Sequence, residues 1–206
     1  DSLSFMTLKK ILSAAASIIK FFIFIFFTTN SNAETNYSKY YSKDLGTLSL
    51  IYHRFNENKY PSTNIQIEIF KKQIDIIKKN NYEFYNPKKF DLEFNKPKLK
   101  KKILISIDDA FSSFYENAWP YLKEHKIPFI LFVSTEPIGK YGYMTWDQIK
   151  EIEKEDFVFI GNHSHSHDYL INYNFEKFKK DIDQSIKIFE EKIGYNPLYF
   201  SYPFGE

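Results

Sequence analysis

Phe157-Val158-Phe159-Ile160-Gly161-Asn162-His163-Ser164-His165-Ser166-His167-Asp168 joins a short apolar run to a cluster of histidines. The run predicts a buried strand that ends at the glycine, and the polar half holds three of the five histidines of the chain. Neutral imidazole is the commonest metal-binding side chain, and a chain without cysteine must build a metal site from nitrogen and oxygen ligands. This segment therefore predicts metal ligands at the C-terminal end of a strand.

A second apolar run, residues 103–107, ends in the paired acids Asp108 and Asp109. Two strands that each deliver metal-capable side chains at their C-terminal ends have the layout of an α/β active site, which indicates a metallohydrolase. Neighbouring residues on a strand point to opposite faces, so we expect the two acids to do different work. One can bind a metal while the other accepts a proton from water. The alternative is that the pair caps a helix that begins near Ser112.

The histidine cluster admits two geometries. In a helical turn, His163 and His167 share a face at i and i+4; in an extended segment, all three imidazoles align. Either way His163 and His167 can converge, and one carboxylate completes a set of two histidines and one acid that leaves coordination positions open. His165 fits a solvated loop equally well.

Strand-like and helix-like segments alternate from residue 47 onward, which predicts a mostly parallel sheet or barrel with right-handed crossovers. A Thr145–Gln148 capping box is expected to open a helix that places Trp146, Ile149 and Ile152 on one face. Strands are expected at residues 48–52, 82–85, 103–107, 129–133, 157–160 and 198–201. Further helices are expected at residues 68–79, at 112–125 despite Pro120, and at 175–193, the last with apolar positions Phe178, Ile182, Ile186, Phe189 and Ile193.

Composition sets the outer limits. The chain has 206 residues, enough for one domain or part of a larger one, and its 43% apolar content with 22 Phe and 16 Tyr can form a core. The absence of cysteine excludes disulfides and a thiolate nucleophile. The net charge of +2 resides in residues 1–33, which leaves the remainder formally neutral and argues against nucleic acid as the main partner. The lysine-rich run at residues 96–102 is interpreted as a solvated loop rather than an anion-binding patch.

The N-terminal region has the pattern of an export signal. After Met6 come Lys9 and Lys10, an apolar run over residues 11–27 broken by Lys20, and small residues at 31 and 33. Residues 1–33 are therefore interpreted as a signal peptide, which predicts export to the periplasm, the cell envelope or the medium. The alternative is an uncleaved anchor over residues 11–29, which Lys20 makes costly. Membrane contact is expected only through this segment.

Three motifs occur in the order and context of one known family. Ser106-Ile107-Asp108-Asp109-Ala110, residues 162–167 and Phe200-Ser201-Tyr202-Pro203-Phe204-Gly205 resemble motifs of the polysaccharide deacetylase family, the NodB-homology domain of carbohydrate esterase family four. Ile51-Tyr52-His53-Arg54-Phe55 and Met144-Thr145-Trp146-Asp147 resemble further segments of it. The resemblance covers about residues 48–206. It implies an α/β fold, a distorted (β/α) barrel, with residues 34–100 as a lead-in that carries the first β/α elements and residues 101–206 as the N-terminal part of the deacetylase domain.

The resemblance also implies an activity, the metal-dependent removal of N-acetyl groups from polysaccharides that contain N-acetylglucosamine. Carried over by position, Asp108 resembles the catalytic base. Asp109, His163 and His167 resemble the metal ligands, with Zn²⁺ expected and other transition metals open. Phe204 stands where the family offers a backbone N–H to the oxyanion. Zn²⁺ lowers the pKa of bound water to about 7, which suits this chemistry.

The chain departs from the family pattern in three places. Ala110 stands where the family usually has glycine, and it is strained if the turn needs a positive φ. Ser201 stands where the family usually has an arginine that orients the base. The later motifs, with the histidine that acts as general acid, have no counterpart up to Glu206, so we expect a fragment, a barrel incomplete at its C-terminus.

Two other functions remain open. One is a non-catalytic envelope protein that binds glycans on the same fold, and the other is a metallohydrolase of a different amide or ester. His53 fits the rim of the site or a structural role equally well.

Overall fold

The computed structural model describes residues 47–89 and 101–206, which all belong to one compact unit. The predicted signal peptide lies outside the described residues, as do residues 34–46 and 90–100 of the predicted lead-in. Among the helices that are described, none is long and apolar enough to cross a bilayer.

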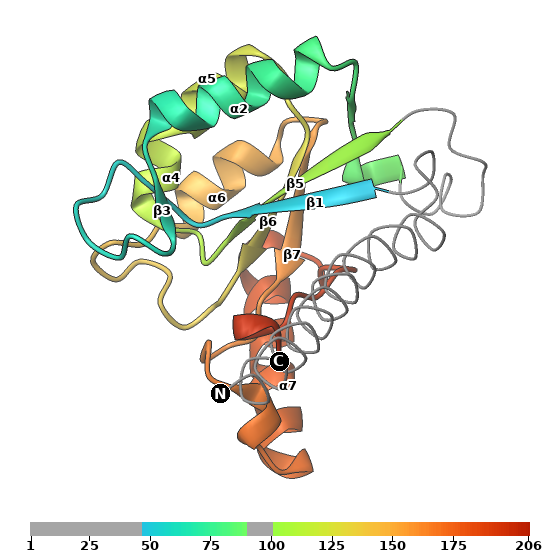
Figure 1. The fold of residues 1–206 in the computed structure, drawn as a ribbon. Coiled ribbons are helices and arrows are strands. Elements are labelled where there is room, and N and C mark those ends of the chain that lie inside the picture. Colours follow the sequence, from blue (N-terminus) through green and yellow to red (C-terminus); the bar gives the residue numbers. More distant parts are fainter. Residues whose placement is uncertain (1–46, 90–100) are drawn as a thin grey trace, which may run out of the picture. The chain divides into compact units, whose positions relative to one another are not determined.

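A parallel sheet forms the centre of this unit, with strand order β1-β5-β6-β7 and with β4 also paired to β5 (Figure 1). Strand β1 lies beside β5 so that Tyr52 pairs with Ile107, and β5 places Asp108 opposite Phe132 of β6. The carboxyl ends of β1, β5 and β7 therefore open at the same edge of the sheet. The strands are β1 (Thr47–Tyr52), β4 (Glu83–Phe84), β5 (Lys102–Asp108), β6 (Phe129–Val133) and β7 (Val158–Asn162).

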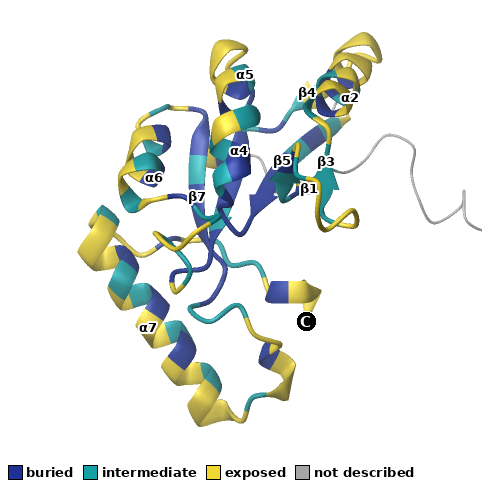
Figure 2. Ribbon diagram, turned by 90° about the vertical axis from the view of Figure 1, so that its left-hand side faces the viewer, coloured by how far each residue is buried: buried dark blue, intermediate teal, exposed yellow. Residues whose placement is uncertain are grey.

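Helices α2, α4, α5 and α6 lie together on one side of the sheet, and α7 lies apart from them near the end of β7 (Figures 1 and 2). Their apolar faces and the strands bury a core in which aromatic rings such as Phe70, Phe114 and Phe129 are fully covered. The helices are α2 (Ile67–Lys79), α4 (Ser112–Asn117), α5 (Trp119–Glu124), α6 (Trp146–Glu153) and α7 (Phe175–Ile193), with 3₁₀ turns at Pro87–Lys89, Leu170–Asn172 and Pro203–Gly205.

Local sequence signals explain most of these elements. The predicted capping box of α6 is confirmed, because the Thr145 hydroxyl accepts the Gln148 N–H at 3.2 Å and the Gln148 side chain accepts the Thr145 N–H at 2.8 Å. Helix α7 has the predicted bounds and ends at Gly194, whose φ of 84° is the left-handed cap that glycine favours.

Three predictions about elements need correction. The helix expected at residues 112–125 is two helices, because α5 starts afresh at Trp119 and places Pro120 in a first turn, where no N–H is required. The strand expected at residues 198–201 is a single bridge between Phe200 and Asn162, since Pro197 and Pro203 on either side cannot donate to a longer ladder. Strand β7 continues one residue past Gly161.

Gly161 lies inside β7 for a packing reason. A Cβ at this position would stand 2.4 Å from the ring of Phe132 on the neighbouring strand. The glycine therefore lets that aromatic ring lie flat against the backbone just before the histidine cluster.

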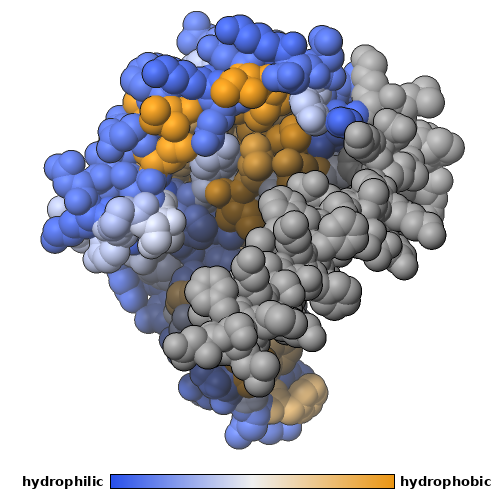
Figure 3. Space-filling model, viewed as in Figure 1, coloured by the Kyte–Doolittle hydropathy of each residue, from blue (hydrophilic) through white to orange (hydrophobic). Residues whose placement is uncertain are grey.

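Within the described residues, the apolar face of α7 is only partly buried. Phe189 is buried, together with the polar Asp181 and Ser185, whereas Phe178, Ile182 and Ile186 line a shallow groove with Phe200 and Tyr202. Figure 3 shows a second apolar area over β1 and α2, where Leu48, Ile51 and Ile76 are exposed.

Candidate metal centre

The paired acids lie at a backbone turn that directly follows β5. Asp108 ends the strand, and Asp109 and Ala110 both have positive φ, 75° and 57°. Because Asp109 has left the strand, the alternation expected from strand geometry does not apply. Both carboxylates approach one imidazole, with His163 Nε2 at 3.9 Å from Asp108 Oδ2 and at 3.5 Å from Asp109 Oδ1. The helix-capping alternative is excluded, since the N-cap of α4 is Phe111 and no side chain caps it.

The histidine cluster is neither helical nor extended. Ser164 and His167 have φ values of 71° and 58°, and these two left-handed residues fold the segment back on itself. The rings of His163 and His167 come to 5.1 Å between centroids, and His167 Nε2 lies 2.7 Å from Asp109 Oδ1. Potential ligand atoms of Asp109, His163 and His167 all lie within 4.8 Å of one another.

This donor set fits a divalent transition metal. Two imidazole nitrogens and one carboxylate oxygen are ligands that Zn²⁺ accepts, and three protein ligands leave a position open for water or substrate. The buried oxygens Asp108 Oδ1 and Asp109 Oδ1 accept no hydrogen bond of regular geometry from the described residues. Asp109 Oδ1 does lie 2.7 Å from His167 Nε2, but Asp108 Oδ1 has no hydrogen-bond partner among the described residues. Buried carboxylate oxygens rarely lack a partner, so this pair of acids indicates a place for a cation.

A second layer of hydrogen bonds holds the ligands in position. His163 Nδ1 lies 2.8 Å from the backbone oxygen of Ser201, which directs Nε2 toward the acids. Ser164 Oγ accepts the His167 N–H at 3.0 Å, and the Asn162 side chain accepts the Ser164 N–H at 2.9 Å. The loop is therefore braced from within and from the C-terminal segment.

Helix α7 braces the same loop from outside. The buried carboxylate of Asp181 accepts the N–H of His165 at 2.8 Å and that of Ser166 at 3.0 Å. The ring of His165 turns away from the centre and pairs with Thr135 Oγ1 at 2.8 Å. Sequence reasoning missed Asp181; its signal was a polar residue one helical turn before Ser185, between the apolar positions of α7.

Electrostatics separates the two acids. Burial, with the nearby charge of Asp109, raises the pKa of Asp108 to about 7. Burial by itself would raise the pKa of Asp109 too, but the imidazoles of His167 and His163 hold it below its usual value. Asp109 is thus the permanent anion of the pair, whereas Asp108 can take up and release a proton near neutral pH.

The imidazoles of His163 and His167 also differ in pKa. Burial lowers the pKa of His163 to about 4, so this ring is neutral and available as a ligand at neutral pH. Burial opposes protonation of His167 as well, but its contact with Asp109 raises its pKa on balance.

His53 and Phe204 border this centre. His53 follows the Tyr52–Ile107 pair and so lies level with Asp108 at the sheet edge; burial lowers its pKa, and it interacts electrostatically with Asp109 and His167. The ring of Phe204 stacks on Tyr169 at 3.9 Å and meets the His167 ring at 4.9 Å. Phe204 itself has a φ of 59°.

The family of the chain follows from comparison with known proteins. The family model described as polysaccharide deacetylase matches residues 95–206, more than half of the chain. The chain is 26% identical over 171 residues to the poly-beta-1,6-N-acetyl-D-glucosamine N-deacetylase of Staphylococcus aureus, a match that covers 76% of this chain and 59% of that protein. The chain therefore spans less than two thirds of the length of this curated relative.

Solved structures show the same fold. IcaB from Ammonifex degensii superposes with a TM-score of 0.70 at 27% identity, over 80% of this chain and 76% of that one. The Streptococcus pyogenes deacetylase PplD superposes with a TM-score of 0.68 at 20% identity, over 78% of this chain and 75% of that one. The predicted NodB-type α/β architecture is confirmed, with the parallel sheet forming part of a distorted (β/α) barrel. The chain belongs to the polysaccharide deacetylase family.

Proposed function

We propose that the full-length protein is an exported, metal-dependent polysaccharide deacetylase that hydrolyses N-acetyl groups of polymers containing N-acetylglucosamine. The observation that carries this proposal is the convergence of Asp109, His163 and His167 beside a second acid whose pKa is close to neutrality. The name of the Staphylococcus aureus relative supports the choice of substrate class. The signal-like residues 1–33 support export.

In this proposal Asp109, His163 and His167 hold the ion. When bound, a divalent cation such as Zn²⁺ supplies a Lewis acid that polarises a carbonyl and acidifies water. Asp108, which is not needed as a ligand, would accept the proton of the attacking water. Burial raises its pKa in the absence of an ion, and a bound cation would favour the carboxylate form that acts as the base. The backbone N–H of Phe204 is assigned to the developing oxyanion, where one such donor typically contributes on the order of 3 kcal/mol.

The departing amine requires a proton donor. The resemblance places that donor, a histidine, in later motifs of the family that have no counterpart up to Glu206, so we assign it to the full-length protein. His53 is half-buried at the same sheet edge as Asp108, and burial lowers its pKa, so we give it no catalytic role.

Acetate release tests the proposed function. The full-length protein, loaded with Zn²⁺, is incubated with β-1,6-linked and β-1,4-linked N-acetylglucosamine oligomers, with and without chelator. We expect release that chelator abolishes and that Zn²⁺ restores. Binding of the oligomers without any acetate release would favour the non-catalytic glycan-binding alternative, and release from small acetyl esters alone would favour a different hydrolase.

A further inference from the structure

One arginine stands at the mouth of the metal centre without a part in the chemistry described above. Arg54 lies in β2 (Arg54–Phe55), which pairs with β3 (Asn64–Ile65) in a small separate sheet. It lines a cavity of about 240 Å³ whose walls also include Asp109 and His167. A ligand seated in this cavity would therefore touch the metal centre and the guanidinium together.

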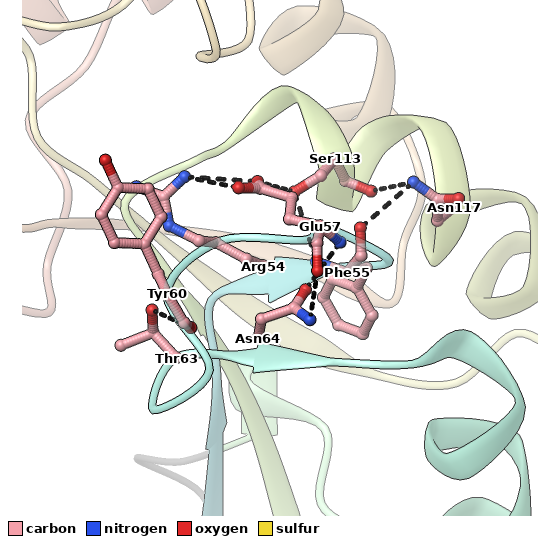
Figure 4. A network of polar contacts seen from close by, with 8 residues as sticks. All are labelled: Arg54, Phe55, Glu57, Tyr60, Thr63, Asn64, Ser113 and Asn117. Atoms are coloured by element: carbon pink, nitrogen blue, oxygen red, sulfur yellow. Dashed lines mark hydrogen bonds and ion pairs between the residues drawn. The ribbon is translucent and has the colours of Figure 1, made fainter.

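The guanidinium is fixed in place from three sides. Its Nη1 donates to both carboxylate oxygens of Glu57, at 3.2 and 2.9 Å. Its Cζ atom lies 3.4 Å from the ring centroid of Phe111 and 4.5 Å from that of Tyr60. Such a sandwich between aromatic faces orients a guanidinium strongly, and Figure 4 shows Arg54 between Tyr60 and Glu57.

Glu57 is fixed in turn, so the position of Arg54 is built into the fold. Ser113 Oγ, on α4, donates to Glu57 Oε1 at 2.6 Å and accepts the Phe55 N–H at 3.2 Å. Asn64 on β3 exchanges two hydrogen bonds, both 2.8 Å, with the backbone of Glu57 (Figure 4). A network that spans β2, β3 and α4 thus serves to hold one side chain at the cavity.

Part of the donor capacity of Arg54 is unused. The Nε and Nη2 donors have no hydrogen-bond partner among the described residues, although the side chain is only 17% exposed. A partly covered donor pair beside a cavity favours a ligand oxygen. Because Glu57 already neutralises the positive charge, the subsite suits an uncharged hydroxyl better than a carboxylate. Tyr60, which is 57% exposed, adds an aromatic surface of the kind that packs on a sugar ring.

We propose that Arg54 is a specificity-determining residue, which donates to a hydroxyl of a neutral N-acetylhexosamine ring while the acetamide of that ring lies at the Asp109–His163–His167 centre. This inference rests on the proposed function and names the part of the site that selects the sugar.

Steady-state kinetics on a neutral β-1,6-linked N-acetylglucosamine tetramer test the assignment. Arg54→Lys keeps the charge but loses the planar fork and the stacking. We expect its KM to rise tenfold or more while kcat falls less than threefold. Lys71→Met is the matched control, because Lys71 also lies over an aromatic ring, Tyr121, but on α2 outside the cavity; it should leave both constants within twofold. An unchanged KM in Arg54→Lys, or a loss confined to kcat, would overturn the assignment.

Direct binding separates this assignment from the proposed function. The tetramer is titrated by calorimetry into Zn²⁺-loaded Asp108→Asn protein, with and without the Arg54→Lys change, after both are shown to melt cooperatively. A tenfold weaker binding in the protein that also carries Arg54→Lys supports the assignment. This holds even if the unsubstituted protein releases no acetate and the proposed function is wrong. If the Asp108→Asn protein with Arg54 intact does not bind the tetramer, the assignment is refuted.

A second variant covers the case in which Arg54→Lys does not fold. Glu57→Gln keeps the shape of the network and leaves the guanidinium charge uncompensated. The ratio of affinities for a carboxylate-bearing oligomer over the neutral tetramer should rise at least fivefold. An unchanged ratio would count against a neutralised guanidinium in the subsite.

Discussion

The carboxylate of Asp181, on α7, accepts the backbone N–H of His165 at 2.8 Å and so ties the histidine loop to a helix that supplies no ligand of its own. The same carboxylate also takes the N–H of Ser166, so one buried acid fixes two consecutive peptide groups. The geometry of His163 and His167 therefore depends on a residue that lies well beyond the motif that contains them.

Asp181→Ala should lower the affinity for Zn²⁺ by 10- to 100-fold, the usual cost of losing an outer partner of a metal site. Chelator competition at neutral pH measures this. Asp183→Ala is the matched control, since Asp183 lies on the same helix and, among the residues that the structure describes, pairs with the exposed Lys179 alone. Equal losses in the two variants would show that α7 acts only through general stability.

His167→Ala should lower Zn²⁺ affinity by at least 100-fold, because it removes one of three ligand groups and the shorter of the two imidazole contacts of Asp109. Metal content after dialysis gives the result. His125→Ala, at the end of α5, should retain a full equivalent of metal. Full occupancy in His167→Ala would disprove the assigned ligand set.

Asp108→Asn should abolish deacetylation and stabilise the metal-free protein above neutral pH. The folded protein holds the proton of Asp108 up to about pH 7, whereas an ordinary aspartate loses it near 3.8. Between these values the folded state binds more protons than the unfolded state, so the free energy of unfolding falls as pH rises. Each pKa unit corresponds to about 1.4 kcal/mol, so the asparagine variant should gain a few kcal/mol across this window.

Urea unfolding in EDTA at pH 5 and pH 8 checks this prediction. The advantage of the variant should be small at pH 5 and larger at pH 8, and added Zn²⁺ should reduce it, since a cation stabilises the carboxylate. A pH-independent difference between the two proteins would contradict a raised pKa.

The turn that brings the two acids together includes Ala110, and substitutions at this residue test whether its backbone is strained. Its φ of 57° costs an alanine about 1–2 kcal/mol, but its buried methyl and the lower chain entropy of alanine recover a similar amount. Ala110→Gly should therefore change the free energy of unfolding by less than about 1 kcal/mol. Ala110→Val should lower it by more than about 2 kcal/mol, because a branched side chain resists positive φ and the site is closely packed. Equal stability of the valine variant would exclude backbone strain at this turn.

The longer helices and strands could be predicted from sequence because the signals that specify them are local. The apolar run of β5, the capping box at Thr145 and the spacing of α7 each specify an element within a few residues. Strands β2 and β3 were missed because each has two residues and no periodicity to detect. The strand expected at residues 198–201 was wrong because its apolar run bridges β7 only at Phe200, where the flanking Pro197 and Pro203 prevent a longer ladder.

The candidate metal centre could also be predicted only in part. The residue types of Asp109, His163 and His167 identified a donor set, but their conformations could not be read from sequence. A His-Ser-His-Ser-His pattern satisfies both helical and extended spacing, and the positive φ values of Ser164 and His167 are accompanied by hydrogen bonds to Ser164 Oγ, Asn162 and Asp181. Two of these bonds lie within the loop, and the bond to Asp181 is a tertiary contact, which can override local propensity.

The bond between His163 Nδ1 and the Ser201 oxygen has a consequence for biosynthesis. The ribosome produces the acids and the histidine loop long before it reaches position 201, so a nascent chain halted upstream lacks the group that selects the imidazole tautomer. Such a chain would capture the ion weakly, and tight loading would begin only after the segment around Ser201 emerges and docks.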